Sequence, residues 1–261
     1  MLDVVVVSCG LTNNIYYLSP NSLELKMNDD VVFETDNGLL IGKVIKIYQE
    51  KSKNLSLPLS NVLRLATKED FKKNTKNQEL SSKALNEAKK LAKELDLEMN
   101  FIDSYFSLDN SQLVLLFLSE NRVDFRDIAK KLASKYKTRI ELRQIGVRDK
   151  AKKIGGLGPC GLFLCCNSFL TDFNSVSINM AKNQMLALNP SKINGICGRL
   201  LCCLGYENDV YTEMKKDLPK IGLVADTSLG MGKVVSVDIF KKTYSVDIKD
   251  KGIVEFSKDE K

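Results

Sequence analysis

The amino-acid sequence predicts an α+β protein with small β-modules at both ends, a central α-β-β-α-β layer and a Cys-rich helical unit. Three observations carry this prediction. Valine-rich runs broken by turn residues occur near both ends, apolar residues recur at helical spacing between them, and six of the seven cysteines lie in two similar motifs. The expected boundaries are 1–75 for the N-terminal β-module, 76–150 for the α-β-β-α-β region, 151–218 for the Cys-rich unit and 219–261 for the C-terminal β-module.

The composition is that of a globular protein: 261 residues, of which 44% are hydrophobic and 28% charged, with a net charge of +6. The chain has no histidine, which excludes Cys/His zinc sites, histidine-based acid–base catalysis and serine-type triads. It has no apolar run of about 18 residues, so we expect no membrane insertion. The N-terminus does not resemble a signal peptide, so we expect a cytoplasmic protein whose thiols stay reduced.

The N-terminal module is predicted from β-rich runs. Residues 2–8 suit a buried strand, and residues 14–18 suit its partner. The triplet Asp36-Asn-Gly38 separates two further runs, 31–35 and 39–47, which is a strong hairpin pattern.

The central region shows alternating helix and strand patterns. We expect a helix over 79–97, strands over 99–107 and 112–119, a second helix over 123–136 and a strand over 138–145. This order predicts an antiparallel sheet covered by helices.

The C-terminal module resembles the N-terminal hairpin in its order of apolar run, turn and Gly-Lys-Val. Runs at 221–227 and 231–239 flank one turn, and a further pair at 243–248 and 252–256 flanks another. We therefore expect both ends to be small β-modules of the SH3-like or partly open barrel type.

The Cys-rich unit contains Gly158-Pro-Cys-Gly-Leu-Phe-Leu-Cys-Cys166 and Gly195-Ile-Cys-Gly-Arg-Leu-Leu-Cys-Cys203. Both read G-x-C-G-x-x-L-C-C, which indicates one sulfur-rich site closed by two similar halves. Helical patterning over 174–188 and 199–216 surrounds the second motif. The seventh cysteine, Cys9, is expected to be a buried strand residue.

The thiols of the two motifs suit a soft metal. A helix beginning just after Cys160 would favour the thiolate form of that residue. Consecutive cysteines in a helix point about 100° apart, so we expect one of each pair to be a ligand and the other to pack in the core or face a partner. Four thiolates fit an iron–sulfur cluster or an all-cysteine zinc site. The Cys-to-Cys gaps of four and five residues and the apolar surroundings favour the cluster. A dithiol switch and cysteines acting as small core residues remain alternatives.

A basic run, Arg148-Asp-Lys-Ala-Lys-Lys153, precedes the first motif. Together with Arg139 and Arg143 it can contact RNA phosphates, and the alternative is an ordinary solvated face. The glycines at 155, 156 and 158 lack the Gly-Lys-Ser/Thr of a P-loop. The candidate RNA or partner contacts are Arg148, Lys150, Lys152, Lys153 and Arg199.

Five segments closely resemble the bacterial RicT (YaaT) family, whose members carry the region named after the C-terminal part of a yeast polymerase-suppressor protein. The matching segments are Gly155-Gly-Leu-Gly-Pro-Cys-Gly161, Leu164-Cys-Cys166, Val176-Ser-Ile-Asn-Met-Ala-Lys-Asn-Gln184, Leu188-Asn-Pro-Ser-Lys-Ile193 and Gly195-Ile-Cys-Gly-Arg-Leu-Leu-Cys-Cys-Leu-Gly-Tyr-Glu207. The polymerase-suppressor region is expected to coincide with the α-β-β-α-β segment.

The resemblance implies a non-catalytic regulator that forms a complex with two small helical partners, RicA and RicF. Such complexes bear 4Fe–4S clusters, have been associated with a flavin, and modulate mRNA processing by ribonuclease Y. In spore formers they affect sporulation, competence and biofilm formation. By motif position, the implied metal ligands are Cys160, Cys165, Cys166, Cys197, Cys202 and Cys203.

Two other functions remain open from the residues alone. One is a four-cysteine zinc protein that binds RNA directly, through the lysines of the basic run. The other is a redox enzyme that uses the Cys-Cys pairs for thiol exchange, which the lack of histidine disfavours.

Overall fold

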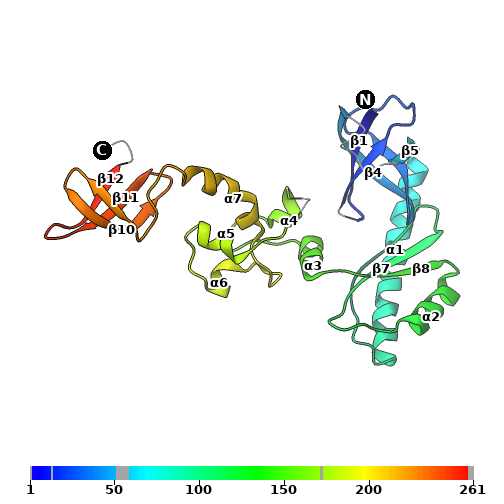
Figure 1. Cartoon of the computed structure of the whole chain (residues 1–261). Helices are drawn as coiled ribbons and strands as arrows, with labels where there is room; N and C mark the ends of the chain where they lie inside the picture. The colour runs from blue at the N-terminus through cyan, green and yellow to red at the C-terminus, as the bar shows by residue number, and fades with distance from the viewer. Residues whose placement is uncertain (1, 13, 51–58, 171–172, 258–261) are drawn as a thin grey trace. The chain divides into compact units, whose positions relative to one another are not determined.

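The protein is described by a computed structural model that covers residues 2–12, 14–50, 59–170 and 173–257 (Figure 1). The chain divides into two compact units, Met1–Gly155 and Gly156–Lys261. Within the described residues, no helix combines the length and the apolar character needed to cross a membrane.

The first unit opens with a five-stranded barrel. Its strands are β1 (Leu2–Cys9), β2 (Asn14–Ser19), β3 (Asp30–Thr35), β4 (Gly38–Glu50) and β5 (Ser60–Leu65). The order is β1-β2-β5-β3-β4, and β4 pairs with β1 to close the barrel. The expected hairpin is confirmed, because Thr35 pairs with Gly38 across the predicted turn. Of the two types expected for this module, SH3-like or partly open barrel, the partly open one is wrong, since the long strand β4 pairs with both β3 and β1.

Alternation along the strands explains the barrel core. Val5, Val7 and Cys9 of β1 point inward and pack with Phe33 and Leu40. Cys9 is fully buried, which confirms the prediction of an ordinary core residue.

The central layer follows the predicted order of elements. It comprises α1 (Lys68–Glu94), β6 (Asn100–Phe106), β7 (Gln112–Leu118), α2 (Arg126–Tyr136) and β8 (Arg139–Gln144). The sheet order is β6-β7-β8, with β6 antiparallel and β8 parallel to β7. The prediction of an antiparallel sheet is therefore wrong for β8. The chain leaves β7 and returns through α2 to the starting end of β7, so β8 runs parallel to it.

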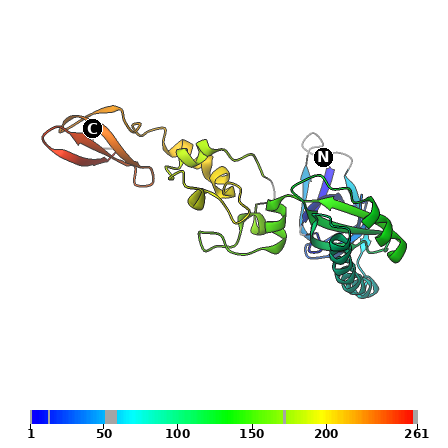
Figure 2. The same cartoon turned by 90° about the horizontal axis from the view of Figure 1, so that it is seen from below.

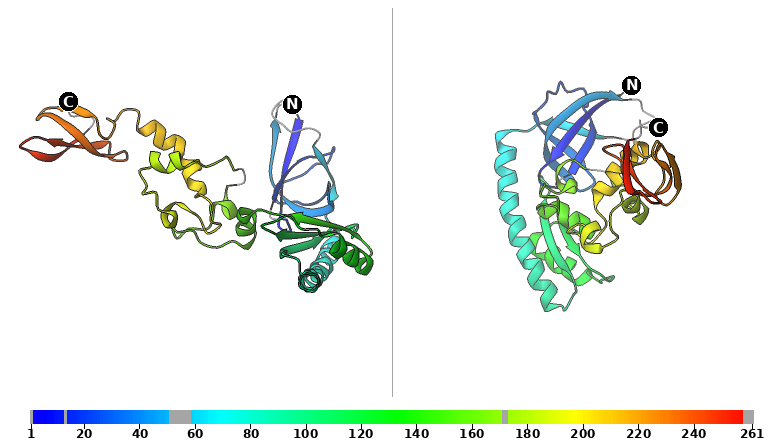
Figure 3. Two further views of the ribbon diagram at one scale, coloured as in Figure 1. Left: turned by 60° about the horizontal axis from the view of Figure 1, so that its bottom comes forward. Right: turned by 90° about the vertical axis from the view of Figure 1, so that its left-hand side faces the viewer.

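The central strand β7 is buried on both faces of the sheet. One face packs against the helices through Leu113 and Leu115 of β7 together with Ala88 of α1 and Ile128 of α2. Tyr105, Val114 and Leu116 point the other way, into the barrel core. Figure 3 shows α1 running beside both the barrel strands and the sheet. The barrel and the central layer consequently share one framework.

Helix α1 begins 11 residues earlier than predicted, at Lys68 in place of Glu79. Thr67 and Asp70 form a capping box, and Arg64 of β5 donates two hydrogen bonds to Asp70, at 2.5 and 2.9 Å. The inner face of this first half is polar, with Asn77 and Ser81 bonded to the main chain of β6 and the residue after it. Apolar periodicity cannot reveal a helix that docks through hydrogen bonds.

The described residues of the second unit form four helices and a sheet, and Figure 2 shows the sheet at the C-terminal end of the chain. The helices are α4 (Cys165–Ser168), α5 (Ile178–Asn183), α6 (Pro190–Ile193) and α7 (Cys202–Met214), whereas α3 (Val147–Ile154) belongs to the first unit. The helix expected over 174–188 is limited to α5, because Met185 adopts a positive φ of 56° just beyond its C-terminal end.

The C-terminal module is a four-stranded sheet rather than a barrel within the described residues. Its strands, β9 (Val224–Thr227), β10 (Gly230–Asp238), β11 (Thr243–Ile248) and β12 (Gly252–Ser257), pair in the order β12-β11-β10-β9. Val234, Val246 and Phe256 form its small core.

We predict that Asp70→Asn lowers the free energy of unfolding by about 1–2 kcal/mol at neutral pH, because it weakens the cap of α1. The Arg64 hydrogen bonds hold the pKa of Asp70 well below its usual value. The stabilisation is therefore complete above the unfolded-chain pKa of about 4 and is lost as pH falls toward the folded-state pKa. Denaturant unfolding of both proteins should show the difference shrinking below about pH 4. Glu79→Gln, an exposed position in the same helix, is the control and should change little at any pH.

We predict that Gly38→Ala destabilises the first unit by more than about 2 kcal/mol. Gly38 has φ 89°, and a Cβ there would lie 2.7 Å from Cβ of Ser107, at the contact between the β3–β4 turn and the central layer. Gly10→Ala, where a Cβ meets nothing within 4 Å, is the control. Equal unfolding midpoints for the two variants would contradict the proposed close approach.

Candidate metal centre

The first cysteine motif folds as a tight loop that ends in a helix. Gly158 N donates to Leu162 O at 2.8 Å, and Gly161 N donates to Gly158 O at 3.0 Å. Gly161 adopts φ 78°, a conformation that favours glycine at the position after Cys160. The loop therefore presents the Cys160 thiol at its tip, where the side chain is exposed.

The second motif has the same local structure. Gly195 N donates to Arg199 O at 2.8 Å, Gly198 N donates to Gly195 O at 2.9 Å, and Gly198 has φ 74°. Isolated bridges at equivalent positions, Leu157 with Phe163 and Asn194 with Leu200, close the two loops. The sequence prediction of two similar halves thus extends to matching hydrogen bonds and backbone angles.

The Cys-Cys pairs lie at the starts of helices. Leu164 and Leu201 precede α4 and α7 with nearly identical angles, φ −53° and ψ 127° against φ −55° and ψ 131°. The condition considered for Cys160, a helix that begins just after it, is not met, because the tight loop intervenes and the helix starts at Cys165.

Equivalent residues of the two halves contact each other. The rings of Phe169 and Tyr206, which occupy the same position after their motifs, lie 5.1 Å apart between centroids. Helices α4 and α7 also pack together. A pair of equivalent residues in contact indicates an approximate two-fold axis between the halves, with the thiols at the helix starts on either side of it.

The electrostatics of the thiols show the same reciprocity. Burial raises the pKa of Cys166, and the neighbouring thiol of Cys202 adds to the effect. Burial likewise raises the pKa of Cys203, with Cys165 as its equivalent neighbour. Exchanging the two halves turns the Cys166–Cys202 pair into the Cys203–Cys165 pair. Without a cation, these thiols resist ionisation, and a bound metal would displace their protons.

The donor set suits a thiophilic metal, since it has six thiols and no histidine. All seven cysteines lie in the described part of the chain. Cys166 is buried, Cys160 is exposed and the other four motif thiols are half-buried. Among the described residues, however, no three of Cys, Asp and Glu are grouped so that they can hold a metal ion in this conformation. The halves bring the thiols near one another without completing a coordination shell.

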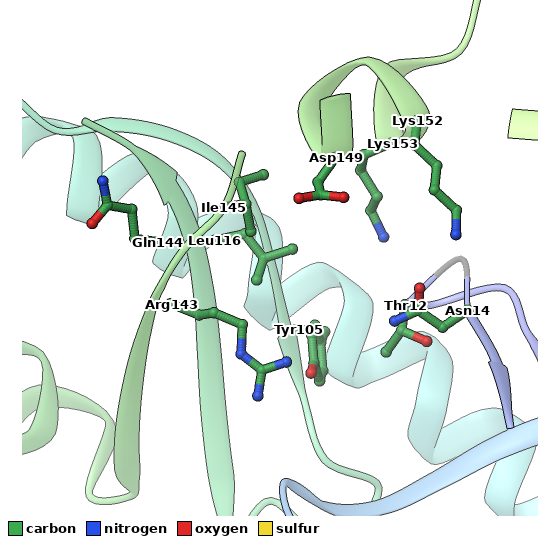
Figure 4. A pocket seen from close by; sticks show the side chains of 10 residues that line it. All are labelled: Thr12, Asn14, Tyr105, Leu116, Arg143, Gln144, Ile145, Asp149, Lys152 and Lys153. Carbon is green, nitrogen blue, oxygen red and sulfur yellow. The ribbon is translucent and has the colours of Figure 1, made fainter. Parts of the chain in front are cut away.

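The residues predicted to contact RNA differ in their burial and in their partners. Lys153 of α3 donates to Leu11 O at 2.5 Å and pairs with Asp103 at 2.8 Å, so its charge is matched inside the first unit. Lys152 and Lys153 line a cavity with Arg143 (Figure 4). Arg148 and Lys150 are half-buried on α3, and Arg199 is exposed in the second cysteine loop.

Sequence reasoning did not find the cavity or the contribution of Thr12 and Tyr105 to it. These residues are distant in sequence from the basic run and meet it only because α3 packs beside the first barrel turn. The sequence did offer one signal for the cavity: Arg143 and the basic run are both candidate contacts for phosphate.

Two models of known protein families match different parts of the chain. Residues 60–145 match the PSP1 C-terminal conserved region, from β5 of the barrel to the end of β8, and this includes the predicted α-β-β-α-β segment. Residues 175–218 match the third domain of PSP1-like proteins. No solved structure matches the chain.

The chain is also similar over nearly its whole length to a curated protein, Stage 0 sporulation protein YaaT of Bacillus subtilis (strain 168). The two are 42% identical over 249 residues, which cover 95% of this chain and 90% of that protein. Identity at this level over both chains, together with the two PSP1 matches, shows that the chain belongs to the YaaT (RicT) family of PSP1-region proteins.

Proposed function

We propose that the protein is a non-catalytic iron–sulfur scaffold subunit of the cytoplasm that modulates ribonuclease Y-dependent mRNA processing. The observation that carries the proposal is the pair of equivalent cysteine loops related by an approximate two-fold axis. The repetition of the cysteine loop is explained if both halves contribute thiolates to a shared inorganic group.

The six motif thiols would hold a 4Fe–4S cluster. Such a cluster supplies one-electron redox chemistry when bound. The protein's own contribution is to position sulfur. The positive-φ glycines let each loop turn tightly. Leu164 and Leu204 are buried at the starts of α4 and α7. Because no three of these donors are grouped among the described residues, the site would have to close when the metal or a partner binds.

A scaffold role is supported by the exposed apolar residues near the thiols. Leu162 and Phe163, at the tip of the first loop, are 70% and 71% exposed, and Ile196 of the second loop is 60% exposed. Large exposed apolar side chains of this kind are typical of surfaces that bind other proteins. The proposed partners are RicA-like and RicF-like helical proteins, and a flavin would belong to the complex rather than to this chain.

The relative's name, Stage 0 sporulation protein, supports a role in sporulation in hosts that form spores. Competence and biofilm development are proposed from the family resemblance alone. These effects would follow from altered processing of transcripts and not from a reaction catalysed by this subunit.

We predict that anaerobically purified protein, alone or co-expressed with its partners, contains iron and sulfide and absorbs broadly near 400 nm, as 4Fe–4S proteins generally do. Cys165→Ser and Cys202→Ser, at equivalent positions of the two halves, should each remove most of the iron. Cys9→Ala removes a thiol from the barrel core and is the matched control, since it should leave the iron content unchanged.

A colourless protein with one zinc ion per chain would instead support the structural-zinc alternative. The tight turns after Cys160 and Cys197 are compatible with that metal. If the protein carries neither metal, even when purified with its partners, the metal-centre proposal fails.

We further predict that the cluster controls assembly. Protein stripped of iron should bind the small helical partners or ribonuclease Y at least about tenfold more weakly than the loaded protein, because the loops lose the group that fixes them. Calorimetry or a gel-shift of purified components measures this difference. Equal affinities would show that the cluster does not regulate the scaffold.

A further inference from the structure

A cavity of about 270 Å³ lies within the first unit, and no cysteine lines it. Its walls come from three places: the barrel turn with Thr12, the sheet with Tyr105 and Arg143, and α3 with Lys152 and Lys153. Figure 4 shows the two lysine side chains extending from α3 toward the barrel turn, with the Arg143 guanidinium on the opposite side near Tyr105. Cationic groups therefore approach one space from two different elements.

Neighbouring acids hold two of these cations in place without using all their donors. Glu141 accepts from Nε and Nη2 of Arg143, at 3.2 and 2.7 Å. These two bonds leave Nη1 of the guanidinium with donors to spare. Lys153 is held by Leu11 O and Asp103, which leaves the third proton of its ammonium group. Such pre-positioned donors lose little entropy when a ligand binds.

The remaining lining is suited to an uncharged ligand body. The aliphatic side chains of Leu116 and Ile145 and the ring of Tyr105 form an apolar part of the wall. Tyr105 is almost fully buried, and this burial raises its pKa to about 12, so the hydroxyl stays protonated at neutral pH. The one carboxylate in the lining, Asp149, accepts a hydrogen bond from Gly146 N at the start of α3.

We propose that this cavity binds a small phosphorylated metabolite, with the phosphate held by Arg143, Lys152 and Lys153 and the neutral body against Leu116 and Tyr105. A phosphate offers several acceptor oxygens to charged donors that are already oriented, which gives short, charge-assisted hydrogen bonds. The volume lies just below the roughly 300–1,000 Å³ of pockets for drug-sized ligands, so the ligand has the size of a sugar phosphate.

The site is independent of the metal centre, because no cysteine lines it. A ligand bound there would link α3 to the barrel and the sheet, adding to the contacts that Lys153 already makes. Since it would bind the folded first unit and not the unfolded chain, it should raise the unfolding temperature of that unit.

The experiment uses the full-length protein at low ionic strength, with calorimetry and thermal unfolding as readouts. Inorganic phosphate, glycerol 3-phosphate and ribose 5-phosphate are the probes, and ribose is the uncharged comparison. We expect ribose 5-phosphate to bind and to raise the unfolding temperature, whereas ribose does neither. Lys152→Gln should weaken binding at least about tenfold, because it removes one charge-assisted contact.

Lys150→Gln is the matched control, since it removes the same charge from the same helix at a position outside the lining. Arg143→Gln should also weaken binding, and its unfolding temperature without ligand shows whether the loss of the Glu141 pair has disturbed the fold. Unchanged affinity in the Lys152→Gln variant, or equal losses in Lys152→Gln and Lys150→Gln, would mean that phosphate binds only as an adventitious ion and would overturn the proposal.

No saturable binding of any probe up to about 10 mM would overturn it as well. A 5′-phosphorylated RNA oligonucleotide tests the other source of the same chemistry. If the oligonucleotide binds, depends on Lys152 and is not displaced by ribose 5-phosphate, the site reads RNA and not a small metabolite.

Discussion

The burial of the central strand β7 on both faces of its sheet is the constraint on which the first unit depends. Successive residues of β7 serve different cores: Leu113 and Leu115 pack against α1 and α2, while Val114 and Leu116 pack into the barrel. Neither the barrel nor the helical layer can exchange this strand for another without exposing its own core. The same sheet carries Arg143 at its β8 edge and Asp103 on β6, where the latter holds α3 through Lys153. Packing at the sheet thus fixes the last helix before the cysteine loops.

The second unit is built on a different principle. In the cysteine-bearing part of this unit, before the C-terminal sheet, the apolar cluster is small, with Ala181, Ile193 and Leu204 as its buried members. The order of this part depends more on loop hydrogen bonds than on a large core. A unit with so little buried apolar surface gains much of its stability from anything that joins its halves. Coordination by thiols from both loops would do this, which connects the sparse core to the proposed chemistry.

The sequence allowed the local features to be predicted and gave less information on long-range ones. The β3–β4 hairpin and the cysteine loops follow from residues close together in the chain, such as Asp36-Asn-Gly38 and the glycines after Cys160 and Cys197. The start of α1 was missed because Asp70, Asn77 and Ser81 face inward through hydrogen bonds, so the apolar period is absent there. The direction of β8 was also missed, since an amphipathic helix does not itself specify where the chain re-enters a sheet. The cavity lined by Arg143, Lys152 and Lys153 depends on a contact between Lys153 and Leu11, which no local pattern encodes.

The two halves of the cysteine unit are alike where the thiols lie and different on their outer surfaces. Leu162, exposed on the first loop, is replaced by Arg199 at the equivalent place of the second, and the four-residue helix α4 corresponds to the 13-residue helix α7. A protein that recognises the apolar tip of one loop therefore meets a positive charge at the other. The internal repeat can present a symmetric set of ligands to a metal while offering its surroundings two unlike faces. Any assembly built around the proposed inorganic centre would therefore be directional, with distinct neighbours on its two sides.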